Sequence, residues 1–152
     1  MTESTSIETF KVKATGTGVP TRVKVLDTQW AIQVDESEED GGSNSGPNPM
    51  HYFSAGLAAC LNEQAQVVAE EMKIELGELV MEQEIDLDLA GFMGMENHSN
   101  GSYKQVRLSV KVSGSISESD VQNIGKKVEA RCPIMALLKS SGCEIVSHWE
   151  KA

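Results

Sequence analysis

Two cysteines are the residues best placed for chemistry in this 152-residue sequence. Cys60 lies in the middle of an apolar segment with helical character, and Cys132 directly precedes Pro133, between two predicted helices. A thiol before the first turn of a helix meets unpaired amides and the positive end of the helix dipole, and the neighbouring Arg131 adds positive charge. Because these factors lower a thiol pKa, Cys132 is a candidate reactive cysteine.

Each cysteine taken alone also fits a packing role, since cysteine is among the most buried residue types. Packing is the simpler interpretation of Cys60. For Cys132, the sequence supports packing and reactivity equally. Together the two suggest a dithiol pair, in which one thiolate attacks an electrophile and the other resolves the sulfenic acid to a disulfide. Cys143, at the start of a predicted strand, is expected to pack or simply to be exposed.

The histidines give little support for a metal site, because no two of His51, His98 and His148 are four residues apart. His51 precedes Cys60 by nine residues, about 13 Å along a helix axis, which is too far for direct pairing within one helix. The sequence shows no glycine-rich nucleotide loop and no serine-hydrolase elbow. We therefore expect neither a cofactor nor a metal ion.

The charge balance is acidic, with 13 Lys and Arg against 23 Asp and Glu and a formal net charge of −10. No basic stripe exists to bind phosphates, so neither nucleic acid nor an anionic membrane surface is an expected partner. The N-terminus lacks the features of a signal peptide, and no apolar run approaches the roughly 20 residues of a membrane span. Three widely spaced cysteines without a CxxC motif fit reduced thiols. These features predict a soluble, cytoplasmic protein.

The element that positions Cys60 is a long predicted helix, which begins at the N-cap Asn48 and continues to Lys73. Its first half is apolar on nearly every face and must therefore be buried on every face, so a partner subunit is expected. The preceding segment, residues 35–49, is acidic and then rich in Gly, Ser and Asn, with no core-forming residue. A solvated connector is its simpler interpretation, and a lid over the site is the alternative.

Alternating apolar residues predict a meander of three strands before this helix, with Phe10, Val12 and Trp30 on its inner face. After the helix come two strands, two helices (the first capped by Ser117 or Ser119) and a closing strand. The predicted ranges are 7–14, 22–26, 29–35, 79–89 and 103–113 for the first five strands, 133–142 for the last helix and 143–149 for the last strand. Because strands and helices come in runs, the fold class is α+β, as a single domain over residues 1–152.

The stretch GPNPMHYFSAGLAACL around Cys60, followed much later by EARCPIMALL around Cys132, resembles the OsmC/Ohr family of OsmC-like proteins and organic hydroperoxide reductases. The similarity covers nearly the whole chain. It implies an OsmC-like fold, with antiparallel sheets around the long central helix, in an intertwined homodimer. It also implies a thiol peroxidase that reduces organic hydroperoxides in oxidative-stress defence, with a dithiol reductant of the lipoyl type.

By this resemblance Cys60 matches the peroxidatic cysteine and Cys132 the resolving one. Arg22, the only arginine before the central helix, matches the family's activating arginine. Peroxidase members carry a glutamate directly after the Asn-Pro, where this sequence has Met50, followed by His51. Either His51 or another group replaces that carboxylate, or the chain is a catalytically weak or inactive member that binds an apolar or oxidised small molecule. A structural dimer whose cysteines merely pack is a third hypothesis.

Overall fold

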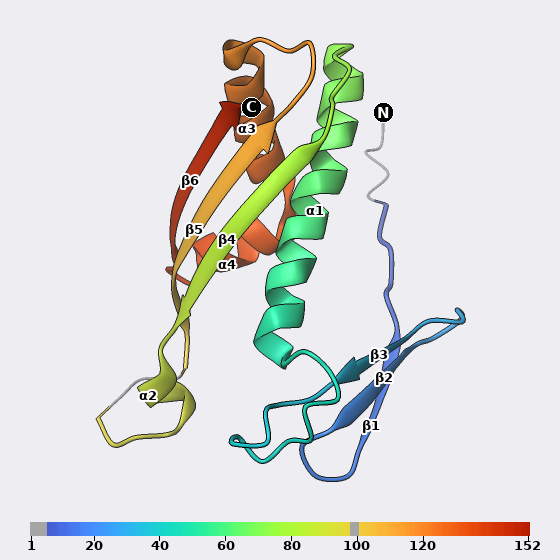
Figure 1. Cartoon of the computed structure of the whole chain (residues 1–152), viewed down its shortest axis with the longest axis vertical. Coiled ribbons are helices and arrows are strands. Elements are labelled where there is room, and N and C mark those ends of the chain that lie inside the picture. Colours follow the sequence, from blue (N-terminus) through green and yellow to red (C-terminus); the bar gives the residue numbers. More distant parts are fainter. Residues whose placement is uncertain (1–5, 98–100) are drawn as a thin grey trace. The chain divides into compact units, whose positions relative to one another are not determined.

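The computed structural model describes residues 6–97 and 101–152 of the chain. The chain divides into two compact units, Met1–Phe53 and Ser54–Ala152 (Figure 1). The central helix α1 (Pro49–Met72) begins in the first unit and ends in the second, with bounds close to those predicted. None of the described helices combines the length and the apolar character that a membrane-spanning helix needs.

The N-terminal unit holds a three-stranded antiparallel sheet in the order β1-β2-β3. Its strands are β1 (Val12–Gly16), β2 (Thr21–Val25) and β3 (Ala31–Val34). The predicted meander is confirmed, although β1 begins later than expected. The predicted burial of its inner face is wrong within one chain, since Phe10, Val12 and Trp30 are 84%, 62% and 66% exposed. A lone three-stranded sheet has no second layer to cover its apolar side chains.

The acidic segment after β3 is folded around one buried carboxylate, that of Asp35. Asp35 accepts hydrogen bonds from the main-chain N–H and the hydroxyl of both Ser43 and Ser45, at 2.6–3.1 Å, and from the Glu36 N–H at 2.8 Å. These bonds hold the pKa of Asp35 well below its usual range. The prediction that this segment lacks a core residue is therefore wrong, because a carboxylate with enough donors can be buried.

The C-terminal unit packs α1, α3 and α4 against one face of a second sheet, whose strand order is β4-β5-β6 (Figure 1). The strands are β4 (Leu79–Leu87), β5 (Tyr103–Val112) and β6 (Glu144–Lys151), and the helices are α3 (Glu118–Arg131), α4 (Pro133–Ser140) and the short α2 (Leu89–Phe92). β4 pairs antiparallel with β5, and β6 pairs parallel with β5. The predicted α+β class is confirmed, but the prediction of antiparallel sheets is wrong for β6, because α3 and α4 form the crossover that a parallel pairing with β5 needs. α2 lies in a connection predicted as a plain loop, and His98 of that loop lies outside the described residues.

The core of this unit is built from the buried sides of α1, β5, α3 and α4. α1 buries one residue every three or four positions, and β5 buries every second residue. The buried side chains of these two elements are Leu57, Leu61, Ala65, Val68 and Ala69 on α1, and Val106, Leu108, Val110 and Val112 on β5. On α1, Ala55 and Ala59 are exposed. One chain therefore does not bury the helix on every face, and the partner subunit expected there stays a prediction.

A close contact between α3 and β6 fixes the corner at which α3 meets α4. A Cβ atom on Gly125 would lie 2.6–2.8 Å from ring atoms of Trp149, so only glycine allows this approach. Trp149 Nε1 donates a hydrogen bond to the Glu129 carboxylate at 2.9 Å, and Lys139 Nζ on α4 lies 4.0 Å from the same carboxylate. Helix α3, helix α4 and the sheet are thus joined beside Cys132.

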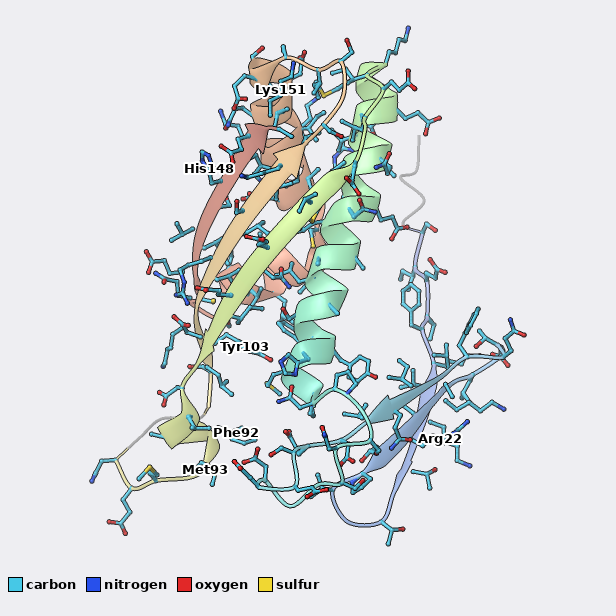
Figure 2. All side chains as sticks on the ribbon, viewed as in Figure 1. Arg22, Phe92, Met93, Tyr103, His148 and Lys151 are labelled. Atoms are coloured by element: carbon cyan, nitrogen blue, oxygen red, sulfur yellow. The ribbon has the colours of Figure 1, made fainter. Side chains whose placement is uncertain are left out.

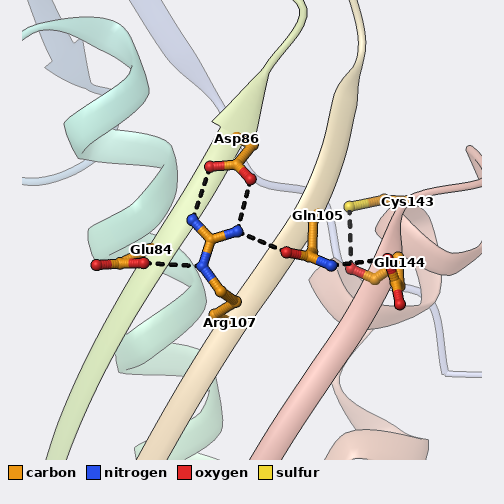
Figure 3. A network of polar contacts seen from close by, with 6 residues as sticks. All are labelled: Glu84, Asp86, Gln105, Arg107, Cys143 and Glu144. Atoms are coloured by element: carbon orange, nitrogen blue, oxygen red, sulfur yellow. Dashed lines mark hydrogen bonds and ion pairs between the residues drawn. The ribbon is translucent and has the colours of Figure 1, made fainter.

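The opposite face of this sheet is polar. Arg107 on β5 donates hydrogen bonds to Glu84 and Asp86 on β4 at 2.6–2.8 Å, and to Gln105 at 2.6 Å (Figure 3). Gln105 in turn donates to Glu144 on β6 at 2.7 Å. A groove of about 550 Å³ lies on this face, lined by side chains that include Glu84, Arg107 and His148. It is on the far side of the sheet from the helices that carry Cys60 and Cys132.

Candidate active site

The fold brings Cys60 and Cys132 into contact, although 72 positions separate them in the sequence. Cys132 Sγ lies 3.1 Å from Cys60 Sγ, and both residues are free cysteines. The two sulfur atoms of a disulfide lie about 2.05 Å apart, so an approach of about 1 Å would join them. The structure therefore places the two thiols within reach of a disulfide, which the sequence left open.

Two helix features place the sulfurs. Cys60 lies on a face of α1 that continues, at helical spacing, with Gln64 and Val67. Cys132 has an extended backbone (φ −66°, ψ 118°) and is both the C-cap of α3 and the N-cap of α4. The N-cap position predicted from Pro133 is thus confirmed, but the Cys132 thiol makes no hydrogen bond to the amides of α4. Its sulfur contacts the Cys60 sulfur instead.

The two thiols differ in accessibility and in surroundings. Cys132 is fully buried, whereas Cys60 is partly exposed. Burial, the Cys132 thiol and the Glu63 carboxylate raise the pKa of Cys60 to about 11, and the main-chain N–H of Ile134 has the opposite effect by donating to the sulfur. Within its own unit Cys60 is therefore a protonated thiol at neutral pH. A thiolate requires a further positive charge nearby.

Arg131, expected to add positive charge beside Cys132, is bound to a carboxylate. Its Nη1 and Nη2 donate to the two carboxylate oxygens of Glu71 at 2.7 and 2.8 Å. This contact holds the pKa of Glu71 below its usual range. The two residues are 60 positions apart on different helices, so no spacing in the sequence could have revealed the pair.

The remaining predicted site residues lie in the N-terminal unit. Arg22 is on β2 (Figure 2), paired in register with Thr15 and Gln33. Met50 and His51 lie in the first turn of α1. Asn48 caps this turn as predicted, with its Oδ1 accepting from the His51 N–H at 2.9 Å. The approach of Arg22 to Cys60, and the roles of Met50 and His51, stay predictions.

Cys143 directly precedes β6, and His148 lies on that strand. Cys143 is buried, and its thiol faces the Glu144 carbonyl at 3.7 Å (Figure 3). Burial, followed by the charges of Asp86 and Glu144, raises the pKa of Cys143. The His148 side chain on β6 is 68% exposed, with Nε2 3.3 Å from a Glu150 oxygen (Figure 2). In the part of the chain that the structure describes, no three His, Cys, Asp or Glu side chains are grouped so that they could hold a metal ion.

A family model described as OsmC-like protein matches residues 42–147, a range that contains both Cys60 and Cys132. The chain belongs to the OsmC-like protein family. A comparison with curated proteins gave no match.

Several solved structures share the OsmC-like fold over nearly the whole chain. An organic hydroperoxide resistance protein OsmC from Legionella pneumophila is 22% identical, with a TM-score of 0.74 over 93% of this chain and 96% of that one. An OsmC-like protein from Mycoplasma pneumoniae is 17% identical, with a TM-score of 0.79 over 95% and 98%. The organic hydroperoxide resistance protein OhrB of Bacillus subtilis is 22% identical, with a TM-score of 0.68 over 97% and 100%. At these identities the likeness establishes the shared fold.

Proposed function

We propose that this OsmC-like protein is a thiol-dependent peroxidase that reduces organic hydroperoxides with the Cys60–Cys132 pair. The proposal is carried by the 3.1 Å contact between a partly exposed sulfur and a fully buried one. The exposed thiol is the one that a peroxide can reach, and the buried one is the one that can resolve it. A role in oxidative-stress defence follows from this chemistry.

The reaction needs two sulfur steps. The Cys60 thiolate attacks the distal oxygen of the hydroperoxide, the O–O bond breaks, and an alcohol leaves while Cys60 becomes a sulfenic acid. Cys132 then attacks this sulfur, water leaves, and the disulfide forms. A dithiol of the lipoyl type reduces the disulfide by exchange and is itself oxidised.

A positive charge must stabilise the Cys60 thiolate, because its own unit raises the pKa of this thiol to about 11. We assign this role to Arg22, whose family counterpart activates the peroxidatic cysteine. His51 and Met50, in the first turn of the same helix as Cys60, are the accessory candidates for orienting the arginine. A histidine ring nitrogen can accept a hydrogen bond from a guanidinium, which a thioether does only weakly.

Apolar side chains left exposed on α1 and α4 support an organic group on the peroxide. Val67 lies on the Cys60 face of α1 and is 42% exposed, and Leu137 on α4 is 60% exposed. Exposed apolar side chains favour a hydrophobic ligand over hydrogen peroxide. The relatives from Legionella pneumophila and Bacillus subtilis are organic hydroperoxide resistance proteins, which supports the same substrate class.

We also propose that the functional form is an intertwined homodimer. The apolar side chains that one chain leaves exposed in β1, in the residues around it and on α1 support this assembly. A second copy would supply the layer that the N-terminal sheet lacks.

The test is to mix reduced protein with cumene or tert-butyl hydroperoxide and to count free thiols. The wild type should lose two of its three thiols, Cys132→Ser should lose one as a sulfenic acid that dimedone traps, and Cys60→Ser should lose none. Cys143→Ser is the matched control and should still lose two. Unchanged thiol counts in the wild type, or the same loss in Cys60→Ser, would overturn the proposal.

A non-catalytic member that binds an apolar or oxidised small molecule is the second candidate, and Met50 is the observation that favours it. A thioether cannot accept charge-assisted hydrogen bonds from an arginine as a carboxylate does. This candidate predicts that dimedone traps no sulfenic acid and that Cys60 keeps the high pKa set by its own unit. The thiol counts above therefore distinguish the two candidates.

A further inference from the structure

An ion pair joins the end of α1 to the last residue of α3, and the peroxidase chemistry does not use it directly. Arg131 donates to both carboxylate oxygens of Glu71 at 2.7 and 2.8 Å, which is the two-point geometry of a strong arginine–carboxylate pair. The two side chains are 42% and 48% exposed, so their contribution to global stability is small. The two-point hydrogen bonding of this pair is more specific than a small contribution to global stability requires.

The pair lies next to the resolving cysteine along the chain. Arg131 and Cys132 are consecutive, so their Cα atoms are about 3.8 Å apart and a shift of one moves the other. Cys132 is also the break between α3 and α4, where an extended residue separates two helices. Movement of α3 at this corner is therefore passed directly to the sulfur.

Two contacts at separate positions along α1 link this helix to the corner between α3 and α4. One link is the contact between the sulfurs of Cys60 and Cys132, and the other is the ion pair at Glu71. Eleven residues separate Cys60 from Glu71, which is about 16 Å along a helix axis. The packing of α3 on β6 holds the corner against the sheet, and two links this far apart along α1 hold it against that helix.

We propose that the Arg131–Glu71 ion pair is a positioning device that keeps Cys132 within reach of Cys60 for disulfide formation. Its use in catalysis rests on the proposed peroxidase function. The sulfurs must approach by about 1 Å, and a misplacement of that size is enough to slow a reaction severely. Because coupling is reciprocal, the disulfide and the ion pair each stabilise the arrangement that the other needs.

The test measures the effective concentration of the two thiols without any peroxide. Reduced protein in a Cys143→Ser background is equilibrated with oxidised and reduced glutathione. Cys60 or Cys132 attacks glutathione disulfide and releases one glutathione, and the second cysteine then displaces the other to form the internal disulfide. The ratio of disulfide to dithiol at equilibrium gives the effective concentration.

Arg131→Met and Glu71→Gln should each lower this concentration about two- to fivefold, the limit set by the strength of a half-exposed ion pair. The double variant should lose no more than either single variant, since both remove the same contact. Arg131→Lys, which keeps the charge without the two-point geometry, should fall between. Lys127→Met is the matched control, because Lys127 acts on Glu71 through its charge from one turn earlier in α3, and it should match the wild type.

Melting temperatures of the reduced proteins separate positioning from general stability, and they should stay close to that of the parent. The positioning role would be overturned if Arg131→Met kept the effective concentration of the wild type. It would also be overturned if Lys127→Met lost as much as Arg131→Met, or if the losses of the two single variants added in the double variant. Because glutathione drives this test, the two proposals fail separately. If the variants show the expected pattern with glutathione but the wild-type thiols do not react with hydroperoxide, only the proposed peroxidase function is overturned.

Discussion

The immediate surroundings of Cys60 disfavour its thiolate, since burial, a second thiol and a carboxylate all raise the pKa of this thiol. The N–H of Ile134 is the counteracting group within the unit, and one amide does not offset three opposing effects. In the proposed mechanism the reactivity of Cys60 therefore depends on a cation, a role that we assign to Arg22.

Arg22→Met should slow the reaction of Cys60 with an organic hydroperoxide at pH 7. Loss of the cation raises the pKa of Cys60, and the thiolate fraction falls about tenfold for each unit of that rise. The measurement is the pH dependence of the rate of thiol loss, which should shift to higher pH. Arg22→Lys keeps the charge and should retain much of the rate, and an unchanged profile in Arg22→Met would refute the assignment.

Alkaline pH should destabilise the reduced protein through Cys60. In the absence of a cation, the folded protein holds this thiol at a pKa of about 11, above the ordinary value of 9.0. A group whose pKa is raised by folding contributes stability below its ordinary pKa and loses it as pH rises toward the folded value. In Arg22→Met, the urea concentration at the unfolding midpoint should therefore decrease as the pH is raised from about 9 to about 11. Adding Cys60→Ala should flatten that fall, and equal slopes for the two proteins would contradict this origin.

The helices and strands differ in how well the sequence predicts them. The long helix with its Asn48 cap, the Ser117 cap of α3 and the alternation in β4 and β5 follow from local patterns, because each signal lies within one turn or one strand. α2 was missed, since a four-residue helix carries no periodicity. Asp35 was missed because its five donors come from residues up to ten positions away in a polar segment.

The α3–β6 contact gives a direct test of packing at the element scale. Gly125→Ala should destabilise the protein by about 1–3 kcal/mol, because the new methyl group would overlap the Trp149 ring. For a chain of this length that corresponds to a fall of roughly 2–12 °C in Tm. Gly56→Ala is the matched control, since its methyl group would meet Ile134 Cδ1 at an ordinary 3.8 Å. A Gly125→Ala protein as stable as the wild type would show that α3 can shift away.

At the scale of the whole molecule, the N-terminal sheet is the part that one chain leaves incomplete. β1 is exposed along its length, and apolar side chains such as Phe10 and Trp30 face solvent. The sequence predicted these strands but not their exposure, because alternation shows which face is apolar and not what covers it. The same limit applies to the site, where residue types suggested a cysteine pair and only the fold shows the 3.1 Å contact.

Sedimentation should show a homodimer with twice the 16.5 kDa mass of one chain at micromolar concentration. Trp30→Glu should shift the equilibrium toward monomer, because a charge replaces an exposed apolar side chain that a partner would bury. Glu8→Gln is a control at an exposed polar position of the same unit and should leave the dimer intact. A monomeric wild type at these concentrations would contradict the proposed assembly.

The central claim is that an organic hydroperoxide converts the Cys60–Cys132 contact into a disulfide. The most direct measurement is peptide mapping after one equivalent of cumene hydroperoxide, with Cys143 alkylation as the internal reference. We expect one intramolecular disulfide between the peptides that contain Cys60 and Cys132, with Cys143 still a free thiol. Both thiols intact, or a disulfide that involves Cys143 in place of either residue, would contradict it.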